Sequence, residues 1–288
     1  MVAVVGQILS VFKLRIGVVI MLSALAGIAV TPGPMPEAYQ VWVLAVAVLI
    51  SAASAGAFNQ YVERDIDGLM SRTANRPFVT GHFTAGPVWP FVIWGLMVSA
   101  VGAAAVAVNA WAALYTFLGA FTYAVVYTVW LKRRTWLNIV FGGLAGSFAV
   151  LAGAAAVDPG IGASAFLFSL ALFLWTPPHF WSLALALKDD YAAAGVPMLP
   201  VVVGAKATAR IILASTLALV LVTLTPAFVG MGLTYLAGAI IGGAIFIWFS
   251  VKLVANPTKR NAMLAFFSSL VQLTLLLVAA MADRWLIS

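Results

Sequence analysis

Residues 41–67 read VWVLAVAVLISAASAGAFNQYVERDID, an apolar run that ends in a group of acidic side chains. The run is long enough to cross the hydrocarbon core of a bilayer, which is about 30 Å thick. Its end holds Glu63, Asp65 and Asp67, three of the eight acidic residues of the chain. A charged side chain near the centre of a bilayer costs on the order of 3 kcal/mol, so acidic residues at the end of such a run indicate a functional site.

The composition of the whole chain indicates a membrane protein. Of its 288 residues, 64% are hydrophobic and 8% are charged, and the mean hydropathy is +1.11. Soluble domains carry about 25% charged residues, so this composition excludes a soluble globular domain. The chain has no cysteine, which excludes disulfides, thiolate nucleophiles, zinc-thiolate sites and iron-sulfur clusters.

Nine apolar runs predict an all-α polytopic membrane protein with nine transmembrane helices, in a single domain over residues 1–288. The runs are 12–30, 41–62, 87–108, 111–130, 137–157, 163–187, 208–229, 232–253 and 262–282.

The distribution of basic residues predicts the orientation of these helices. With the N-terminus in the cytoplasm and the C-terminus outside, fourteen of the fifteen basic residues lie on the cytoplasmic side and Arg284 alone lies opposite. This is the positive-inside pattern, so the net charge of +7 reflects topology and not nucleic-acid binding. A cleaved signal peptide is the alternative for the first run; apolar sequence before Lys13 and its continuation to Val30 favour a retained helix.

The spacing of the first acidic group points to a metal. On a helix, Asn59, Glu63 and Asp67 recur every four residues and drift by about 80° around the axis, so they share one face. That face offers oxygen ligands, which suit Mg²⁺. For this segment alone, a solvated helix end neutralised by Arg64 or Arg72 remains the alternative.

A second acidic pair, Asp189 and Asp190, follows the sixth predicted helix. The two cytoplasmic segments, about 63–86 and 188–207, are therefore predicted to face each other across a central cavity open to the cytoplasm. Basic residues accompany the acids, namely Arg72, Arg76, Lys132, Arg133, Arg134 and Lys188. Acids that hold Mg²⁺ beside bases that bind oxyanions are typical of a diphosphate site. For residues 132–134 alone, a topology anchor is an equal alternative.

Several motifs together carry a family resemblance. The segment Asn59–Asp67, followed by RTANRP at 72–77, resembles the first signature of the UbiA-type intramembrane prenyltransferases. The sequence TPPHFW at 176–181, with KDDY at 188–191 and AGVPMLP at 194–200, is similar to the protohaem IX farnesyltransferases, or haem O synthases, within them. Tyr127-Thr128 with LKRRT at 131–135, and Lys13 with Arg15, match as well. Two departures are Leu14, where proline is usual, and the adjacency of Asp189 and Asp190, where many members space two aspartates by four.

The resemblance implies a reaction and a set of site residues. A farnesyl group would pass from farnesyl diphosphate to a vinyl group of haem B, with addition of water, giving haem O and diphosphate with the help of two Mg²⁺ ions. The implied metal ligands are Asn59, Glu63, Asp67, Asp189 and Asp190, of which Asn59, Glu63, Asp67 and Asp190 are also the implied catalytic residues. The implied diphosphate-binding residues are Arg72, Lys132, Arg133 and Lys188, and the candidate haem contacts are His179, Trp181 and Tyr127.

The resemblance also implies a bacterial inner-membrane location with cytoplasmic active-site loops. A haem A synthase or a terminal oxidase assembly would be the partner beyond the substrates and the lipid bilayer. Aromatic faces at Tyr61, Tyr123, Tyr127 and Trp181 are candidates to stabilise a carbocation, with packing as the alternative for each. His179 is either a haem ligand or a hydrogen-bond partner of backbone freed by Pro177 and Pro178.

Two other functions remain open. A UbiA-type enzyme for another aromatic acceptor, such as 4-hydroxybenzoate, would share the first acidic segment, but it would not need the TPPHFW block. A transporter for a cation or haem would place ionisable residues deep in several helices. The runs after residue 208 are nearly free of charge, which favours an enzyme.

Overall fold

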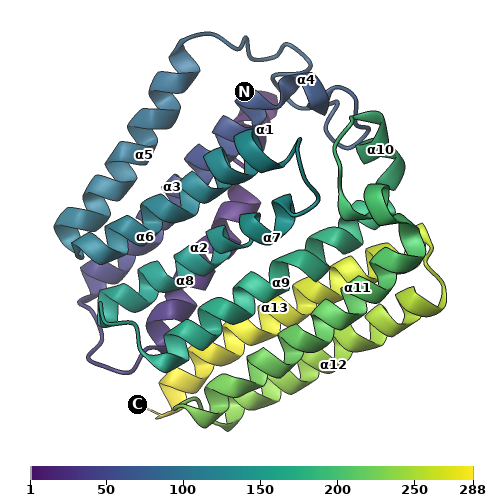
Figure 1. The fold of residues 1–288 in the computed structure, drawn as a ribbon. Helices are drawn as coiled ribbons and strands as arrows, with labels where there is room; N and C mark the ends of the chain where they lie inside the picture. Colours follow the sequence, from purple (N-terminus) through teal and green to yellow (C-terminus); the bar gives the residue numbers. More distant parts are fainter. Residues whose placement is uncertain (1, 288) are drawn as a thin grey trace.

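In the computed structural model, which describes residues 2–287, every regular element is a helix (Figure 1). The elements are α1 (Val2–Val11), α2 (Leu14–Val30), α3 (Ala38–Val62), α4 (Arg64–Asp67), α5 (Val88–Ala107), α6 (Ala110–Phe121), the π-helix η1 (Thr122–Leu131), α7 (Asn138–Gly142), α8 (Leu144–Val157), α9 (Ala163–Ala186), α10 (Lys188–Ala193), α11 (Leu199–Leu224), the 3-10 helix η2 (Thr225–Phe228), α12 (Leu233–Ala255) and α13 (Lys259–Ile287).

The lengths of these helices confirm an all-α membrane protein. Within residues 2–287, eight helical segments are long and apolar enough to cross a bilayer. The pair formed by α1 and α2, bent by 52°, brings the number to nine if it counts as one span. Nine spans and the orientation of the bundle therefore stay predictions. The spans at 110–131 and 138–157 each contain two elements, α6 with η1 and α7 with α8.

One predicted helix boundary is wrong. The seventh helix was expected from residue 208, but α11 begins at Leu199. Pro200 occupies its first turn, where a missing N–H costs nothing. Gly204, with φ +78°, then interrupts the helix at a backbone conformation that glycine adopts readily. The predicted cytoplasmic loop at 188–207 is therefore mostly helical, formed by α10 and the start of α11.

Close contact between α2 and α8 holds the centre of the bundle together. A Cβ atom built on Gly27 would overlap the carbonyl oxygen of Val150, and one built on Gly153 would overlap that of Ala24. Since apolar lipid gives little hydrophobic drive for helices to associate, such close backbone packing is a main source of stability in membranes. The two helices form one wall of the cavity described below.

Replacing Gly153 with alanine is expected to destabilise the folded protein by about 1–3 kcal/mol, the usual cost of overpacking a tight contact. The added methyl group would force α2 and α8 apart. Gly146 on the same helix provides the control, because a Cβ there would meet no atom of residues 2–287 within 4 Å. Thermal unfolding in detergent would measure both variants. A Gly153→Ala protein as stable as Gly146→Ala would contradict the close packing.

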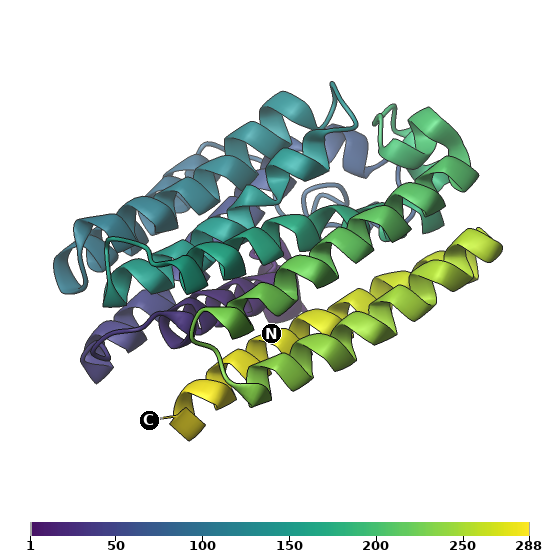
Figure 2. The same cartoon turned by 60° about the horizontal axis from the view of Figure 1, so that its bottom comes forward.

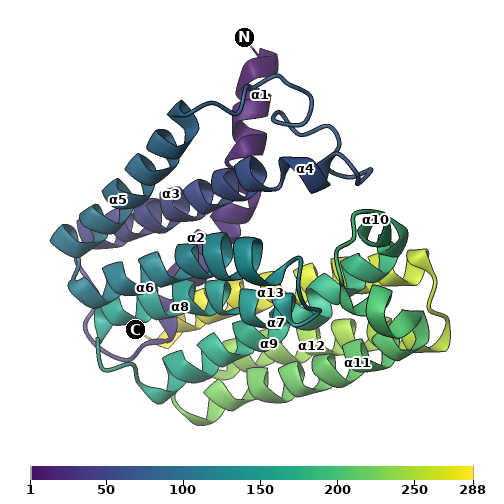
Figure 3. The ribbon, with the colours of Figure 1, turned by 45° about the horizontal axis from the view of Figure 1, so that its top comes forward.

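The arrangement of the helices brings the two acidic segments to one end of the molecule. Figure 1 shows α4 and α10 at the same end, with the C-terminus at the other. Seen from that end, α1 projects away from α2 (Figure 3). Helices α12 and α13 run side by side on the flank of the bundle that lies away from α5 (Figure 2). The fold thus gathers at one end the segments for which a diphosphate site was predicted.

Candidate active site

The three predicted metal ligands stay on one face although the helix that carries them is interrupted. Helix α3 ends at Val62, and Glu63, with φ −89° and ψ 7°, joins it to α4. The prediction of one continuous helix is wrong here. The N–H of Glu63 nevertheless bonds the carbonyl of Asn59, and the N–H of Asp67 bonds that of Glu63, both at 2.9 Å. The helical hydrogen-bond pattern of one turn therefore continues across the break. All three side chains are buried, between 1% and 2% exposed.

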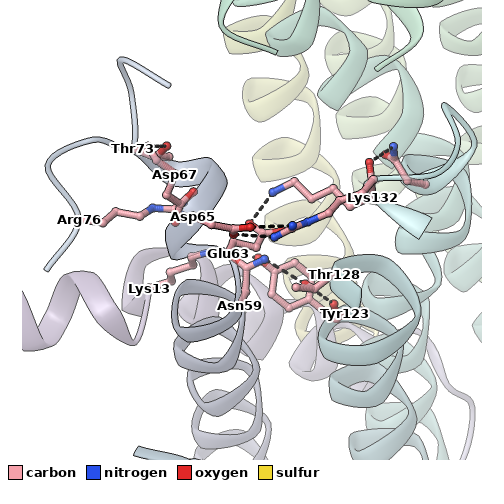
Figure 4. Close-up of polar contacts among 12 residues, drawn as sticks. Lys13, Asn59, Glu63, Asp65, Asp67, Thr73, Arg76, Tyr123, Thr128 and Lys132 are labelled. Atoms are coloured by element: carbon pink, nitrogen blue, oxygen red, sulfur yellow. Dashed lines mark hydrogen bonds and ion pairs between the residues drawn. The ribbon is translucent and has the colours of Figure 1, made fainter. Parts of the chain in front are cut away.

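Each of these three side chains accepts a hydrogen bond from a different base (Figure 4). The pairs are Lys13 with Asn59 at 2.5 Å, Lys132 with Glu63 at 2.5 Å, and Arg76 with Asp67 at 2.5 Å. Burial raises the pKa of the Asp67 carboxyl above its usual range, although the guanidinium of Arg76 opposes the shift. The three oxygen donors and three cations form a compact buried group, which we call the acid-base cluster.

The π-helix η1 supplies one side of this cluster. Its wider turn lets the N–H of Lys132 bond the carbonyl of Tyr127, five residues earlier. The amide nitrogen of Asn59 donates to the hydroxyl of Thr128 at 3.0 Å, which orients the amide oxygen towards Lys13. π-Helices are rare and often lie at functional sites. No pattern in the sequence signalled this one. Lys13 and Thr128 were matched to the family motifs, but they were not predicted as residues of the site.

The residues of the cluster fit a magnesium ion. One carboxylate oxygen of Glu63, Oε1, is buried and has no hydrogen-bond partner among the described residues. Among the described residues, no three His, Cys, Asp or Glu side chains lie close enough together to hold a metal. The available donors are thus two carboxylates and one amide oxygen. Mg²⁺ is usually held by one or two carboxylates and completes its shell with water and substrate phosphates.

The second acidic segment contributes one residue towards the first. Asp190 accepts a hydrogen bond at 2.6 Å from the hydroxyl of Ser71, in the segment after α4. Asp189 is exposed. Next in the chain, Tyr191 is buried, which raises the pKa of its hydroxyl against the opposing charge of Arg72. Of the two adjacent aspartates, Asp190 is therefore the one that faces the first acidic segment.

Three of the four predicted diphosphate-binding residues lie outside the acid-base cluster. Arg133 donates two hydrogen bonds to Asp65, at 2.7 and 2.8 Å, and their side chains are 41% and 60% exposed. These two hydrogen bonds from the guanidinium lower the pKa of the Asp65 carboxyl. Arg72 is also exposed, and Lys188 is half-buried. Of the four predicted residues, Lys132 alone makes a direct contact with a predicted metal ligand in the described part of the chain.

The candidate haem contacts separate into two places. Tyr127 and Trp181 belong to one buried apolar cluster, and the buried indole nitrogen of Trp181 has no hydrogen-bond partner within the described part of the chain. The ring of His179 instead stacks between Trp175 and Phe266, with centroids 4.0 and 4.6 Å away. Its Nδ1 lies 2.7 Å from the hydroxyl of Ser269 on α13. Of the two alternatives for His179, a hydrogen bond to backbone freed by the prolines is not formed among the described residues, and the haem contact stays a prediction.

An apolar cavity adjoins the acid-base cluster. It lies between α2, α3, α6 with η1, and α8, and its lining includes Gly17, Ile20, Val48, Ala52, Tyr115 and Ala149. Lys13 and Tyr123 line it as well. The Tyr123 ring also stacks on Tyr127, with centroids 5.6 Å apart. The site thus joins a charged group to an apolar space, as an amphiphilic ligand would require.

Comparison with known proteins places the chain among prenyltransferases. Residues 20–273 match the model of the UbiA prenyltransferase family. Protoheme IX farnesyltransferase 2 of Paramagnetospirillum magneticum (strain ATCC 700264 / AMB-1) is 61% identical over 274 residues, covering 95% of each chain. Protoheme IX farnesyltransferase 1 of the same organism is 46% identical over 280 residues, covering 96% of this chain and 98% of the relative.

Solved structures share the fold at low sequence identity. A digeranylgeranylglyceryl phosphate synthase superposes with a TM-score of 0.75 at 15% identity, over 97% of this chain and 98% of the other. A UbiA homolog from Archaeoglobus fulgidus bound to DMAPP and Mg²⁺ gives 0.70 at 12% identity, over 94% of this chain and 99% of the other. The family match and the long, close relatives agree with the resemblance seen in the motifs: this chain belongs to the UbiA prenyltransferase family.

Proposed function

We propose that this chain transfers the farnesyl group of farnesyl diphosphate to a vinyl group of haem B, with addition of water, giving haem O and diphosphate. The observation that carries the proposal is the 61% identity, over 95% of both chains, to a protein named Protoheme IX farnesyltransferase 2. The site supports it, because a charged cluster next to an apolar cavity suits a substrate with an isoprenoid chain and a diphosphate head.

The acid-base cluster would bind the diphosphate end. Asn59, Glu63 and Asp67 would hold Mg²⁺, and Asp190 is our choice over Asp189 for a second ion because it faces the first acidic segment. When bound, Mg²⁺ neutralises diphosphate oxygens and makes the group a better leaving group. The UbiA homolog bound to DMAPP and Mg²⁺, which shares this fold, supports the use of Mg²⁺.

The bases of the cluster would change partners when substrate and metal bind. Lys132 and Arg76 neutralise Glu63 and Asp67 in this structure. With these carboxylates holding a metal, the two cations would be free to donate charge-assisted hydrogen bonds to diphosphate oxygens. The net charge of the buried group then stays close to neutral throughout, which avoids the large cost of an unpaired buried charge.

Departure of diphosphate leaves an allylic carbocation, which must be kept from water until the vinyl group attacks. The apolar lining of the cavity excludes water. The stacked rings of Tyr123 and Tyr127 present π-faces that stabilise a positive charge. Attack by the vinyl carbons forms the new C–C bond and moves the positive charge onto the haem side chain, where water adds and releases a proton. Tyr127 and Trp181 are the residues we place against the haem.

The orientation of the bundle is part of the proposal. The end that carries α4 and α10 would face the cytoplasm of a bacterial cell, in the inner membrane. The support is the placement of fourteen of fifteen basic residues in segments assigned to that side.

Purified protein in detergent, given haem B, farnesyl diphosphate and Mg²⁺, is expected to form a haem that carries one farnesyl group and one water. Mass spectrometry of the extracted haem would detect it. Removing the metal with EDTA should abolish the product, and added Mg²⁺ should restore it. Folded protein that binds farnesyl diphosphate but forms no adduct would point to another acceptor, such as 4-hydroxybenzoate. Protein that does not bind farnesyl diphosphate would favour a transporter.

A further inference from the structure

Two buried polar atoms on neighbouring helices have no hydrogen-bond partner among the described residues. One is the indole nitrogen of Trp181 on α9, which is a donor, and the other is the amide oxygen of Asn138 at the start of α7, which is an acceptor. The two residues are 4% and 0% exposed. Because an unpaired polar group in an apolar interior costs free energy, a buried donor and a buried acceptor indicate that a polar ligand binds between them.

The packing of α7 against α9 sets these two atoms at the same level of the bundle. A Cβ on Gly143, at the end of α7, would lie 3.1 Å from the carbonyl oxygen of Phe173 on α9. The rings of Trp136, just before α7, and Trp181, further along α9, have centroids 6.3 Å apart. The two segments therefore run antiparallel, and this register places Asn138 within about one helical turn of Trp181.

Tyr127 on η1 lies next to both residues. A Cβ on Gly142, one turn after Asn138 on α7, would lie 3.1 Å from the Cδ2 atom of the Tyr127 ring. Tyr127 and Trp181 belong to the same buried apolar cluster. The two unpaired atoms therefore adjoin the side chains that we place against the haem.

The chemistry of the two atoms identifies the ligand. The amide nitrogen of Asn138 donates to the carbonyl of Thr135 at 2.6 Å, so the amide is held by its nitrogen and its oxygen points elsewhere. An amide oxygen repels an anion, and the indole N–H of Trp181 repels a cation. The pair thus suits a small neutral molecule that accepts one hydrogen bond and donates another, as water does.

We infer that Trp181 and Asn138 hold the water molecule that adds to the farnesylated haem. The inference rests on the proposed function for the reaction. After the vinyl group attacks the farnesyl cation, the positive charge lies on the vinyl carbon attached to the porphyrin. A lone pair of the held water forms the C–O bond there, and one water proton passes to the diphosphate released earlier. The two side chains orient the water without taking that proton.

The same cation has a second outcome when no water is held beside it. Loss of a proton from the neighbouring CH₂ group gives an alkene, which is lighter than haem O by one water. Both products come from one cation, so their ratio does not depend on how much substrate binds or how fast diphosphate leaves. The ratio therefore reports the position of the water, which a purely structural role of these residues would not change.

Trp181→Phe tests the inference, because it removes the indole N–H and keeps an aromatic ring. Given haem B, farnesyl diphosphate and Mg²⁺, the variant is expected to lower the ratio of hydrated to alkene product about fivefold or more, the usual effect of losing one hydrogen bond. Mass spectrometry of the extracted haem measures both products. Trp136→Phe is the matched control, since it removes the same group from a neighbouring ring that is 36% exposed, and it should leave the ratio unchanged.

Asn138→Ala tests the acceptor independently and should lower the ratio in the same direction. Asn138→Asp, which keeps an oxygen acceptor, should recover part of the loss. Formation of haem O with an unchanged ratio in Trp181→Phe or in Asn138→Ala would overturn the inference, and so would an equal change in Trp136→Phe. An unmodified protein that forms no farnesylated haem would instead refute the proposed function.

Discussion

Replacing Asp67 with alanine is expected to abolish farnesyl transfer, lowering the rate by at least about a hundredfold, while the protein still inserts and folds. Asp67 is buried and is one of the two carboxylates proposed to hold the first Mg²⁺ ion. A metal that stabilises a leaving group contributes several kcal/mol, and each 1.4 kcal/mol is about tenfold in rate. Arg76, its present partner, is 14% exposed and can be solvated after the change.

Asp65→Ala is the control for this prediction. Asp65 lies two residues away in α4, but its side chain is 60% exposed and paired with Arg133 on the surface. Exposed ion pairs contribute about 0–1 kcal/mol, so this variant should lose little activity. Haem O formation and Mg²⁺-dependent binding of farnesyl diphosphate would be measured in both. Full activity of Asp67→Ala would remove Asp67 from the metal site.

Replacing Lys132 with methionine is expected to cost about 3–5 kcal/mol of stability, because it leaves Glu63 as an unpaired buried charge. The Glu63 side chain is 1% exposed and that of Lys132 is 9% exposed. Adding Glu63→Gln should restore most of the stability, since no uncompensated charge then remains. Both variants should lack activity. The single variant has lost a diphosphate-binding cation, and the double variant has also lost a metal ligand.

Thermal unfolding in detergent would separate these effects from those of general charge removal. Arg133→Met changes the next residue in the chain, but its partner Asp65 is exposed, so its stability should change by less than about 1 kcal/mol. Equal losses of stability in Lys132→Met and Arg133→Met would contradict a buried pair. A double variant no more stable than Lys132→Met would also contradict it.

The acidic segments show where prediction from sequence worked and where it stopped. The four-residue spacing of Asn59, Glu63 and Asp67 placed them on one face, and the break at Glu63 kept that spacing because the backbone hydrogen bonds continue across it. The adjacent pair after α9 remained undecided, since both residues carry the same carboxylate and lie in the same short segment. Only packing distinguished them, by placing Asp190 against Ser71 and leaving Asp189 exposed.

The sequence by itself determined the class of protein, most of the helix boundaries and the family. These depend on the length of apolar runs and on local motifs, which are properties of neighbouring residues. The tertiary structure alone decided which base meets which acid. Lys13 and Asn59 are 46 positions apart, and Lys132 and Glu63 are 69 apart. Their contacts depend on the break before α2 and on the wide turn of η1, where packing between helices prevails over local preference, and no local pattern encodes that outcome.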